Sequence, residues 1–173
     1  MELLFKKHEL DTPLGPILAI ANDTGLYLLE FLDWQGLERE IGRLRLETKA
    51  IIVPGQTAPI HSIEQELKAY FDGTLKAFKT PLHILGTPFQ KRAWEALQRI
   101  PYGETRSYRD QAYAVDQPTA FRAVANANGK NRFAIVIPCH RIINHNGGLG
   151  GYGGGIARKK WLIEHEKKYS VSL

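Results

Sequence analysis

The sequence predicts an α+β protein in two parts, a small N-terminal α/β domain over residues 1–80 and a C-terminal helix-turn-helix domain over residues 86–173. The first third alternates short apolar runs with turn residues, and the second half contains helices with clear capping residues. Apolar residues make up 43% of the 173 positions, which is enough to form a core.

The N-terminal part predicts a strand meander followed by two helices. A turn signal at residues 22–25 separates two apolar runs, and leucines recur at helical spacing farther along the chain. The expected elements are strands over 3–10, 16–21 and 26–32, and helices over 37–47 and 60–71. None of them carries visible chemistry, so we interpret this part as a supporting domain.

The second half begins with well-marked helices. Capping boxes at residues 87–90 and 107–110 each predict a helix start, and a break at residues 116–118 predicts another. The helices over 107–115 and 118–128 are short and separated by a tight break. This arrangement resembles a helix-turn-helix, a pattern that also occurs by chance.

Basic residues are concentrated in the same half. Residues 1–83 contain 9 Lys and Arg against 12 Asp and Glu, whereas residues 84–173 contain 14 against 6. A basic half indicates contact with a polyanion, although charge alone fits a solvated basic face equally well. In the second short helix only Phe121, Arg122 and Val124 stand out among small residues, which suits either a tightly packed core or close approach to DNA.

Cys139 is the only cysteine, which makes an internal disulfide impossible and nearly excludes a zinc site built on thiolates. A single cysteine is usually an inert buried residue. Here, residues 134–137 predict a buried strand leading to Pro138, whose fixed backbone angle aims the next side chain. His140 and Arg141 favour the thiolate, and His140 can accept the thiol proton, most simply through a water because successive extended side chains point opposite ways.

A glycine-rich segment follows, with seven glycines in the nine positions 147–155. Gly148 to Gly153 formally match G-x-G-x-x-G. The predicted strand lies ten residues upstream and no P-loop lysine follows, so dinucleotide and P-loop sites are excluded. A loop with so little side-chain bulk suits the entry of a flat ligand, and a flexible linker is the alternative.

The last helix is predicted over residues 156–168. Its basic run, Arg158-Lys159-Lys160, is expected in solvent or facing phosphate. Glu164 and Glu166 are expected to be ordinary surface acids unless one of them turns inward toward His140.

The segment Ile137-Pro138-Cys139-His140-Arg141-Ile142 resembles the active-site signature of the O6-alkylguanine-DNA alkyltransferases, also called methylated-DNA–protein-cysteine methyltransferases. Further matching segments follow in unbroken order over about half the chain, at 86–90, 100–103, 107–108, 122–124, 126–131, 154–155 and 161–166. The resemblance implies a ribonuclease-H-like N-terminal domain and a winged-helix-like helix-turn-helix domain that carries the active site.

The resemblance also implies catalytic roles. Cys139 attacks the alkyl carbon on O6 of guanine, or on O4 of thymine, and keeps the alkyl group. His140 relays the thiol proton through water to Glu166, Asn131 helps to hold the cysteine region, and Tyr108 donates a hydrogen bond to the leaving base. Nothing in the sequence positions a water or a second thiol to reverse the reaction, so single-use stoichiometry is expected.

For DNA, the resemblance implies minor-groove binding to duplexes with alkylated bases. Arg122 fills the gap left when the lesion is rotated out, and the carbonyls of Cys139 and Ile142 read the extruded base. The residues expected at substrate or DNA are Ser107, Tyr108, Arg122, Ala123, Ala127, Gly129, Ile142, Tyr152 and Gly153.

Two departures from the family pattern affect these expectations. Gly153 stands where some members have a serine that can donate a hydrogen bond to the lesion oxygen, which leaves the substrate range open. The N-terminal cysteines that bind structural zinc in some members are absent, so no metal is expected, and no cofactor. Without a signal peptide or an apolar run of membrane-spanning length, we expect a cytoplasmic monomer.

Three other functions fit parts of this sequence pattern. A non-enzymatic lesion-binding protein lacks the reactive cysteine, which is present here as Cys139. A cysteine hydrolase would not explain the basic second half with its helix-turn-helix pattern, and no hydrolase signature surrounds the cysteine. A transcription factor would need an additional regulatory module.

Arg141 is expected to form a structural ion pair.

Overall fold

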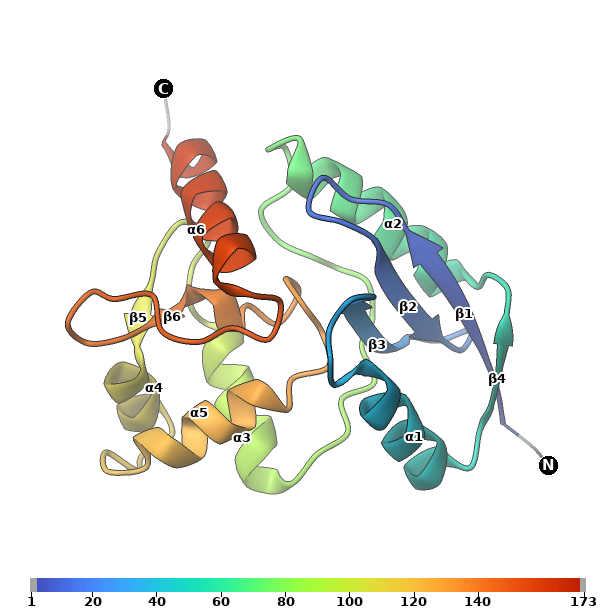
Figure 1. The fold of residues 1–173 in the computed structure, drawn as a ribbon, viewed down its shortest axis with the longest axis horizontal. Coiled ribbons are helices and arrows are strands. Elements are labelled where there is room, and N and C mark those ends of the chain that lie inside the picture. The colour runs from blue at the N-terminus through green and yellow to red at the C-terminus, as the bar shows by residue number, and fades with distance from the viewer. Residues whose placement is uncertain (1–2, 172–173) are drawn as a thin grey trace. The chain divides into compact units, whose positions relative to one another are not determined.

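The computed structural model describes residues 3–171 and divides into two compact units, residues 1–84 and 85–173 (Figure 1). None of the helices within residues 3–171 is long and apolar enough to cross a membrane.

The first unit is built on a sheet with the strand order β3-β2-β1-β4. Its strands are β1 (Leu4–Leu10), β2 (Ile17–Ala21), β3 (Leu26–Phe31) and β4 (Ile51–Pro54). The first three pair antiparallel, which confirms the predicted meander, and β4 pairs in parallel with β1. Strand β4 was not predicted from the sequence, because it is short and has only one buried residue, Ile52.

Two helices complete this unit, as predicted. Helix α1 (Leu37–Thr48) packs against β3, and α2 (Ala58–Phe71) packs against β2. The connector then returns to the sheet, because the backbone N–H of Leu26 donates to the carbonyl of Pro81 at 2.9 Å and that of His83 donates to Leu26 at 2.7 Å. The connecting chain as far as His83 therefore belongs to the first unit.

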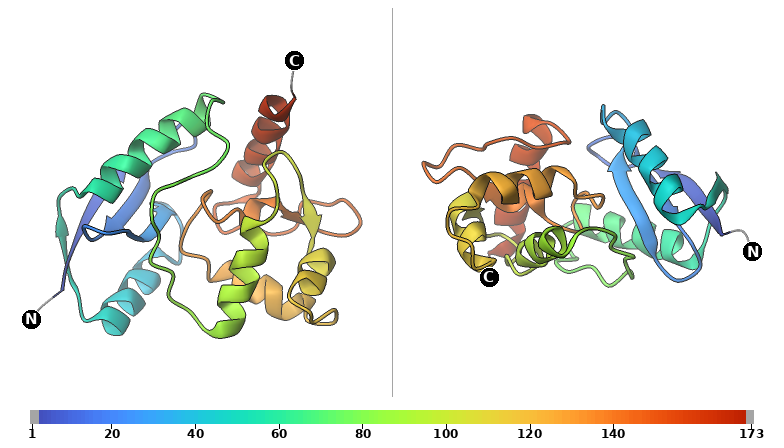
Figure 2. Two further views of the ribbon diagram at one scale, coloured as in Figure 1. Left: turned by 180° about the vertical axis from the view of Figure 1, so that it is seen from behind. Right: turned by 90° about the horizontal axis from the view of Figure 1, so that it is seen from below.

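The second unit contains the helices α3 (Pro88–Gln98), α4 (Tyr108–Ala114), α5 (Phe121–Gly129) and α6 (Ile156–Ser170). Both predicted capping boxes are formed, at the starts of α3 and α4. Helices α3 and α5 lie side by side in Figures 1 and 2, and the indole N–H of Trp94 donates to the Ala127 carbonyl at 2.8 Å. A reciprocal pair of amide hydrogen bonds, each 2.8 Å, joins Gln111 of α4 to Asn128 of α5.

The buried strand predicted over residues 134–137 is wrong. The segment is a sequence of turns in which the N–H of Val136 donates to the Ala134 carbonyl, and Ile135 has a φ of 70°. Residues 134, 135 and 137 are buried as expected, because a short apolar run reports burial without distinguishing a strand from a turn. Cys139–Arg141 likewise form a turn of 3-10 helix and not an extended segment.

Candidate active site

The backbone around Cys139 is held by Asn131. The Asn131 side-chain amide donates to the carbonyl of Ile137 at 2.8 Å and lies 3.5 Å from the Cys139 sulfur, and its oxygen accepts the N–H of Phe133 at 2.9 Å. Asn131 is 5% exposed, and such buried polar contacts fix a loop in one conformation. Cys139 itself is partly exposed and so remains accessible.

Beneath Cys139 lies a fully buried charge network. The imidazole Nε2 of His140 is 2.7 Å from Oε2 of Glu166. The guanidinium of Arg141 reaches the same carboxylate through Nε (2.7 Å) and Nη2 (3.2 Å), and donates through Nη1 to the carbonyl of Ile100 at 2.7 Å. Glu166 therefore turns inward, and Arg141 forms the expected ion pair.

The network sets the protonation of its members. Burial opposes ionisation of Glu166, but the hydrogen bonds from His140 and Arg141, together with the charge of Arg141, outweigh it and lower the pKa of this carboxyl well below its usual range. Burial lowers the pKa of His140, against the opposing influence of Glu166. The pair at rest is thus a neutral imidazole beside a carboxylate, and this imidazole can accept a proton.

The second imidazole nitrogen is the one left for such a transfer. Nδ1 of His140 is buried and has no hydrogen-bond partner among residues 3–171. Because Nε2 is engaged by Glu166, a proton arriving from Cys139 would be taken up at Nδ1, and the carboxylate would stabilise the resulting imidazolium.

In the turn before α4, the backbone of Gly103 lies close to the last helix, α6, beside this network. Gly103 has a φ of 83°, and a Cβ at this position would lie 2.5 Å from Cβ of Ser170 and 3.3 Å from the carbonyl oxygen of Glu166. Only glycine fits there, since both the backbone angle and the space exclude a side chain. The turn therefore packs directly on α6 next to the Glu166 backbone.

Above Cys139 opens a small pocket of about 160 Å³. Most of its walls are small residues or aromatic rings. The residues lining it are Tyr108, Ala125, Asn128, Gly129, Cys139, Gly151, Tyr152 and Gly153. The glycine-rich segment forms one side of this pocket and the end of α5 forms another, so the open loop expected from the sequence does border the cysteine.

A short parallel strand pair places Tyr108 in this pocket. Strand β5 (Arg106–Ser107) pairs with β6 (Ile142–Ile143), which directly follows the Cys139 turn. The first residue of α4 is thereby fixed beside the thiol. Burial, and then the charge on Cys139, raise the pKa of Tyr108, which keeps its hydroxyl a proton donor.

Lys159 was predicted to lie in solvent or to face phosphate, and this prediction is wrong. Its side chain is fully buried, and its ammonium donates to the carbonyl of Gly151 at 3.0 Å, across the glycine-rich segment. Burial lowers the pKa of Lys159 to about 8, and the charge on Cys139 acts in the opposite direction. The attraction between the Lys159 ammonium and a negatively charged Cys139 sulfur favours the thiolate form of Cys139. The burial of Lys159 could have been predicted from helical spacing, because this residue shares a helix face with Leu162, Ile163 and Glu166, all of which are buried.

The remaining residues predicted to contact substrate or DNA differ in their exposure and in their contacts. Ala127 and Ile142 are buried, so their side chains do not face a ligand, and packing of α5 on α3 accounts for the first. The Ser107 hydroxyl accepts the N–H of Asp110 at 3.0 Å as the cap of α4. Arg122 and Ala123 are exposed on α5. The pocket residues that the sequence analysis missed are Ala125, Asn128 and Gly151.

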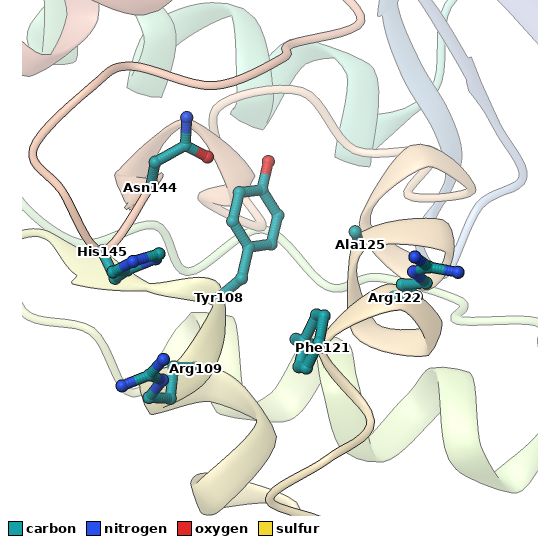
Figure 3. Close-up of a pocket in the computed structure, with 7 residues that line it drawn as sticks. All are labelled: Tyr108, Arg109, Phe121, Arg122, Ala125, Asn144 and His145. Carbon is teal, nitrogen blue, oxygen red and sulfur yellow. The ribbon is translucent and has the colours of Figure 1, made fainter.

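A second and larger pocket of about 300 Å³ adjoins the first, and Tyr108 lines both (Figure 3). Arg122, at the start of α5, lies at its border together with Phe121. The exposed side of α5 therefore continues directly from the Cys139 pocket.

Comparisons with known proteins agree with this architecture. Residues 5–84 match the "6-O-methylguanine DNA methyltransferase, ribonuclease-like domain", and residues 88–168 match the corresponding "DNA binding domain". A Methanosarcina barkeri methylated-DNA–protein-cysteine methyltransferase is 40% identical over 158 residues, covering 91% of this chain and 94% of that protein. The Bacillus subtilis constitutive enzyme of the same name is 41% identical, covering 91% and 92%.

Solved structures give the same result. The Mycobacterium tuberculosis O6-methylguanine methyltransferase is similar with a TM-score of 0.82 and 40% identity, over 98% of this chain and 96% of that one. A complex of the M. tuberculosis protein with DNA gives 0.81 and 38%, over 96% and 94%. The predicted fold class is confirmed, and the chain belongs to the 6-O-methylguanine DNA methyltransferase family.

Proposed function

We propose that this protein repairs DNA by moving the alkyl group of O6-alkylguanine onto Cys139, once per protein molecule, with O4-alkylthymine as a further substrate. One observation carries the proposal: the only cysteine lies between a buried His140–Glu166 pair and a pocket lined by Tyr108 and glycines. It acts on duplex DNA as a monomer in the cytoplasm.

The transfer is a displacement at the alkyl carbon. The thiol proton leaves through water to Nδ1 of His140, and the charge of Glu166 stabilises the imidazolium. The Cys139 sulfur then forms a bond to the alkyl carbon as the bond from that carbon to O6 breaks, and the electron pair passes to the guanine. The Tyr108 hydroxyl donates a hydrogen bond to the ring nitrogen that gains charge. The guanine anion then takes a proton from water, the His140 imidazolium returns its proton to water, and neutral unmodified guanine remains in the DNA.

The product on the protein is a thioether, which is chemically stable. Cys139 is the sole thiol of the chain, so no second sulfur can take the alkyl group from it. One protein molecule therefore removes one lesion, and the reaction is limited by the amount of protein.

The DNA contacts follow from the basic second half and the exposed start of α5. Arg122 enters the minor groove and fills the space of the extruded base, with the small residues around it allowing close approach. The other basic side chains supply affinity that is independent of sequence and sensitive to salt.

Intact-mass and peptide-mass measurements test the proposal, after incubation with a duplex carrying one O6-methylguanine. The expected result is one added methyl group on Cys139 and one repaired guanine per protein. Unmodified protein that still binds the duplex would show a lesion-binding function instead, and repeated turnover would exclude single-use transfer. Arg122→Ala should reduce transfer from the duplex much more than transfer from free O6-benzylguanine.

A further inference from the structure

The second pocket lies between the starts of α4 and α5 and the turn after β6, and apart from Tyr108 and Arg122 its lining residues have no role in the chemistry above. Its volume is about 300 Å³, nearly twice that of the Cys139 pocket. It is lined by Tyr108, Arg109, Phe121, Arg122, Ala125, Asn144 and His145 (Figure 3). Tyr108 and Ala125 line both pockets, so whatever fills one lies next to the occupant of the other.

The lining chemistry fits a nucleotide unit. Tyr108, Phe121 and His145 supply aromatic rings for contact with a sugar or a base, and Arg109 provides a cation for a phosphate. None of the seven lining residues is acidic. In Figure 3 the Phe121 ring lies between the side chains of Arg109 and Arg122, so the apolar surface and the cations alternate along the rim.

Phe121 is the most informative of these residues. It is the first residue of α5 and is 50% exposed, in a helix whose other residues are mostly small. A half-exposed phenyl ring contributes little to the core. Apolar side chains next to an inserted arginine are typical of proteins that widen or kink the minor groove, where they press on sugars and base edges.

We propose that this pocket is a subsite for the nucleotide directly adjoining the extruded lesion on the same strand, with Phe121 against its sugar or base and Arg109 against its phosphate. The proposal rests on the proposed function, because the Cys139 pocket must hold the lesion. Tyr108 then separates the two nucleotides, with one on each side of its ring.

The experiment measures single-turnover methyl transfer from three duplexes, with the O6-methylguanine placed internally, at a 5′ end or at a 3′ end. Phe121→Ala should slow transfer from the internal lesion about tenfold, the size expected for loss of one aromatic–nucleotide contact. On the one terminal duplex that lacks the adjoining nucleotide, wild type and variant should react equally. Transfer from free O6-benzylguanine should be unchanged by the substitution.

Tyr113→Ala is the matched control, since Tyr113 is an aromatic residue on α4, 61% exposed and outside both pockets. It should behave as wild type on all substrates. A Phe121→Ala deficit of equal size on all three duplexes, or no deficit at all, would overturn the subsite. Failure of the wild-type protein to transfer from the internal lesion would instead overturn the proposed function.

A second variant tests the phosphate contact. Arg109→Gln should make the negative slope of the logarithm of duplex affinity against the logarithm of salt concentration shallower by about 0.9, the value for one phosphate neutralised. Arg99→Gln, at an exposed arginine outside this pocket, should change the slope less. An unchanged slope for Arg109→Gln would remove the phosphate from the proposed subsite.

Discussion

Two buried glutamates, one in each unit, have opposite protonation states. Glu166 in α6 is 1% exposed, and His140 and Arg141 lower its pKa against the opposing effect of burial. Glu30 in β3 is 8% exposed, and burial raises its pKa to about 8, with the backbone N–H of Phe31 lowering it and Glu40 raising it further. Burial is similar at the two sites, so the neighbouring charges make the difference.

The comparison explains why the candidate chemistry resides in the second unit. A carboxylate can stabilise the imidazolium of His140 only if it stays ionised at neutral pH, and the Arg141 guanidinium ensures that for Glu166. Glu30 is largely protonated at pH 7 and could not do this. The predictions below replace one buried ionisable side chain at a time.

The largest effect is expected for Arg141→Met. It leaves the Glu166 carboxylate buried without its main cation, which should lower the free energy of unfolding by about 3–5 kcal/mol. Arg99→Met breaks an exposed pair with Glu95 and should cost less than about 1 kcal/mol. Denaturant unfolding of both variants measures the difference, and equal costs would contradict the role of burial.

Glu166→Gln should slow methyl transfer by about 100-fold, in the range that a positioned acid–base group contributes. The amide can still contact His140 but carries no charge to stabilise the imidazolium. Glu164→Gln, at an exposed position on the same helix, is the matched control and should react as wild type. Single-turnover rates for the two variants test this, and a wild-type rate for Glu166→Gln would exclude the relay.

Lys159→Met should lower the rate at which iodoacetamide alkylates Cys139 at pH 7 by about tenfold, which corresponds to about 1.4 kcal/mol. The ammonium favours the thiolate below pH 8, where it is charged, so the difference from wild type should shrink as the pH rises above 8. Cys139 is the only thiol, so the reaction reports on it alone. The neighbouring exposed residue provides the control, and Lys160→Met should leave the rate unchanged at every pH.

The smallest effect on activity is expected for Glu30→Gln, which should not alter methyl transfer. Its signature is the pH dependence of stability. The folded carboxyl binds a proton more tightly than the unfolded one, so its stabilising contribution is complete below pH 4.5 and is lost as the pH rises to about 8. The variant should reduce this loss by roughly 3–4 kcal/mol between pH 5 and 8. Parallel stability curves for variant and wild type would contradict the raised pKa.

Much of the fold could be predicted from local patterns. The capping boxes at the starts of α3 and α4 form as expected, since they depend on residues three positions apart. The meander and the helices of the first unit follow from apolar periodicity. The errors came where local pattern is ambiguous: the run 134–137 is a buried turn, and the basic run that contains Lys159 conceals a helix face directed inward.

Local sequence patterns predicted the first three strands and most of the helices, and the sequence alone contains the basic second half and the one cysteine with its histidine neighbour. Which charges are buried, and which groups face them, depends on the tertiary fold. The carbonyl partner of Arg141, Ile100, is 41 residues away from it along the chain, and its carboxylate partner, Glu166, is 25 residues away. Desolvation and pairing depend on such distant contacts, and no periodicity within one helix or loop specifies them.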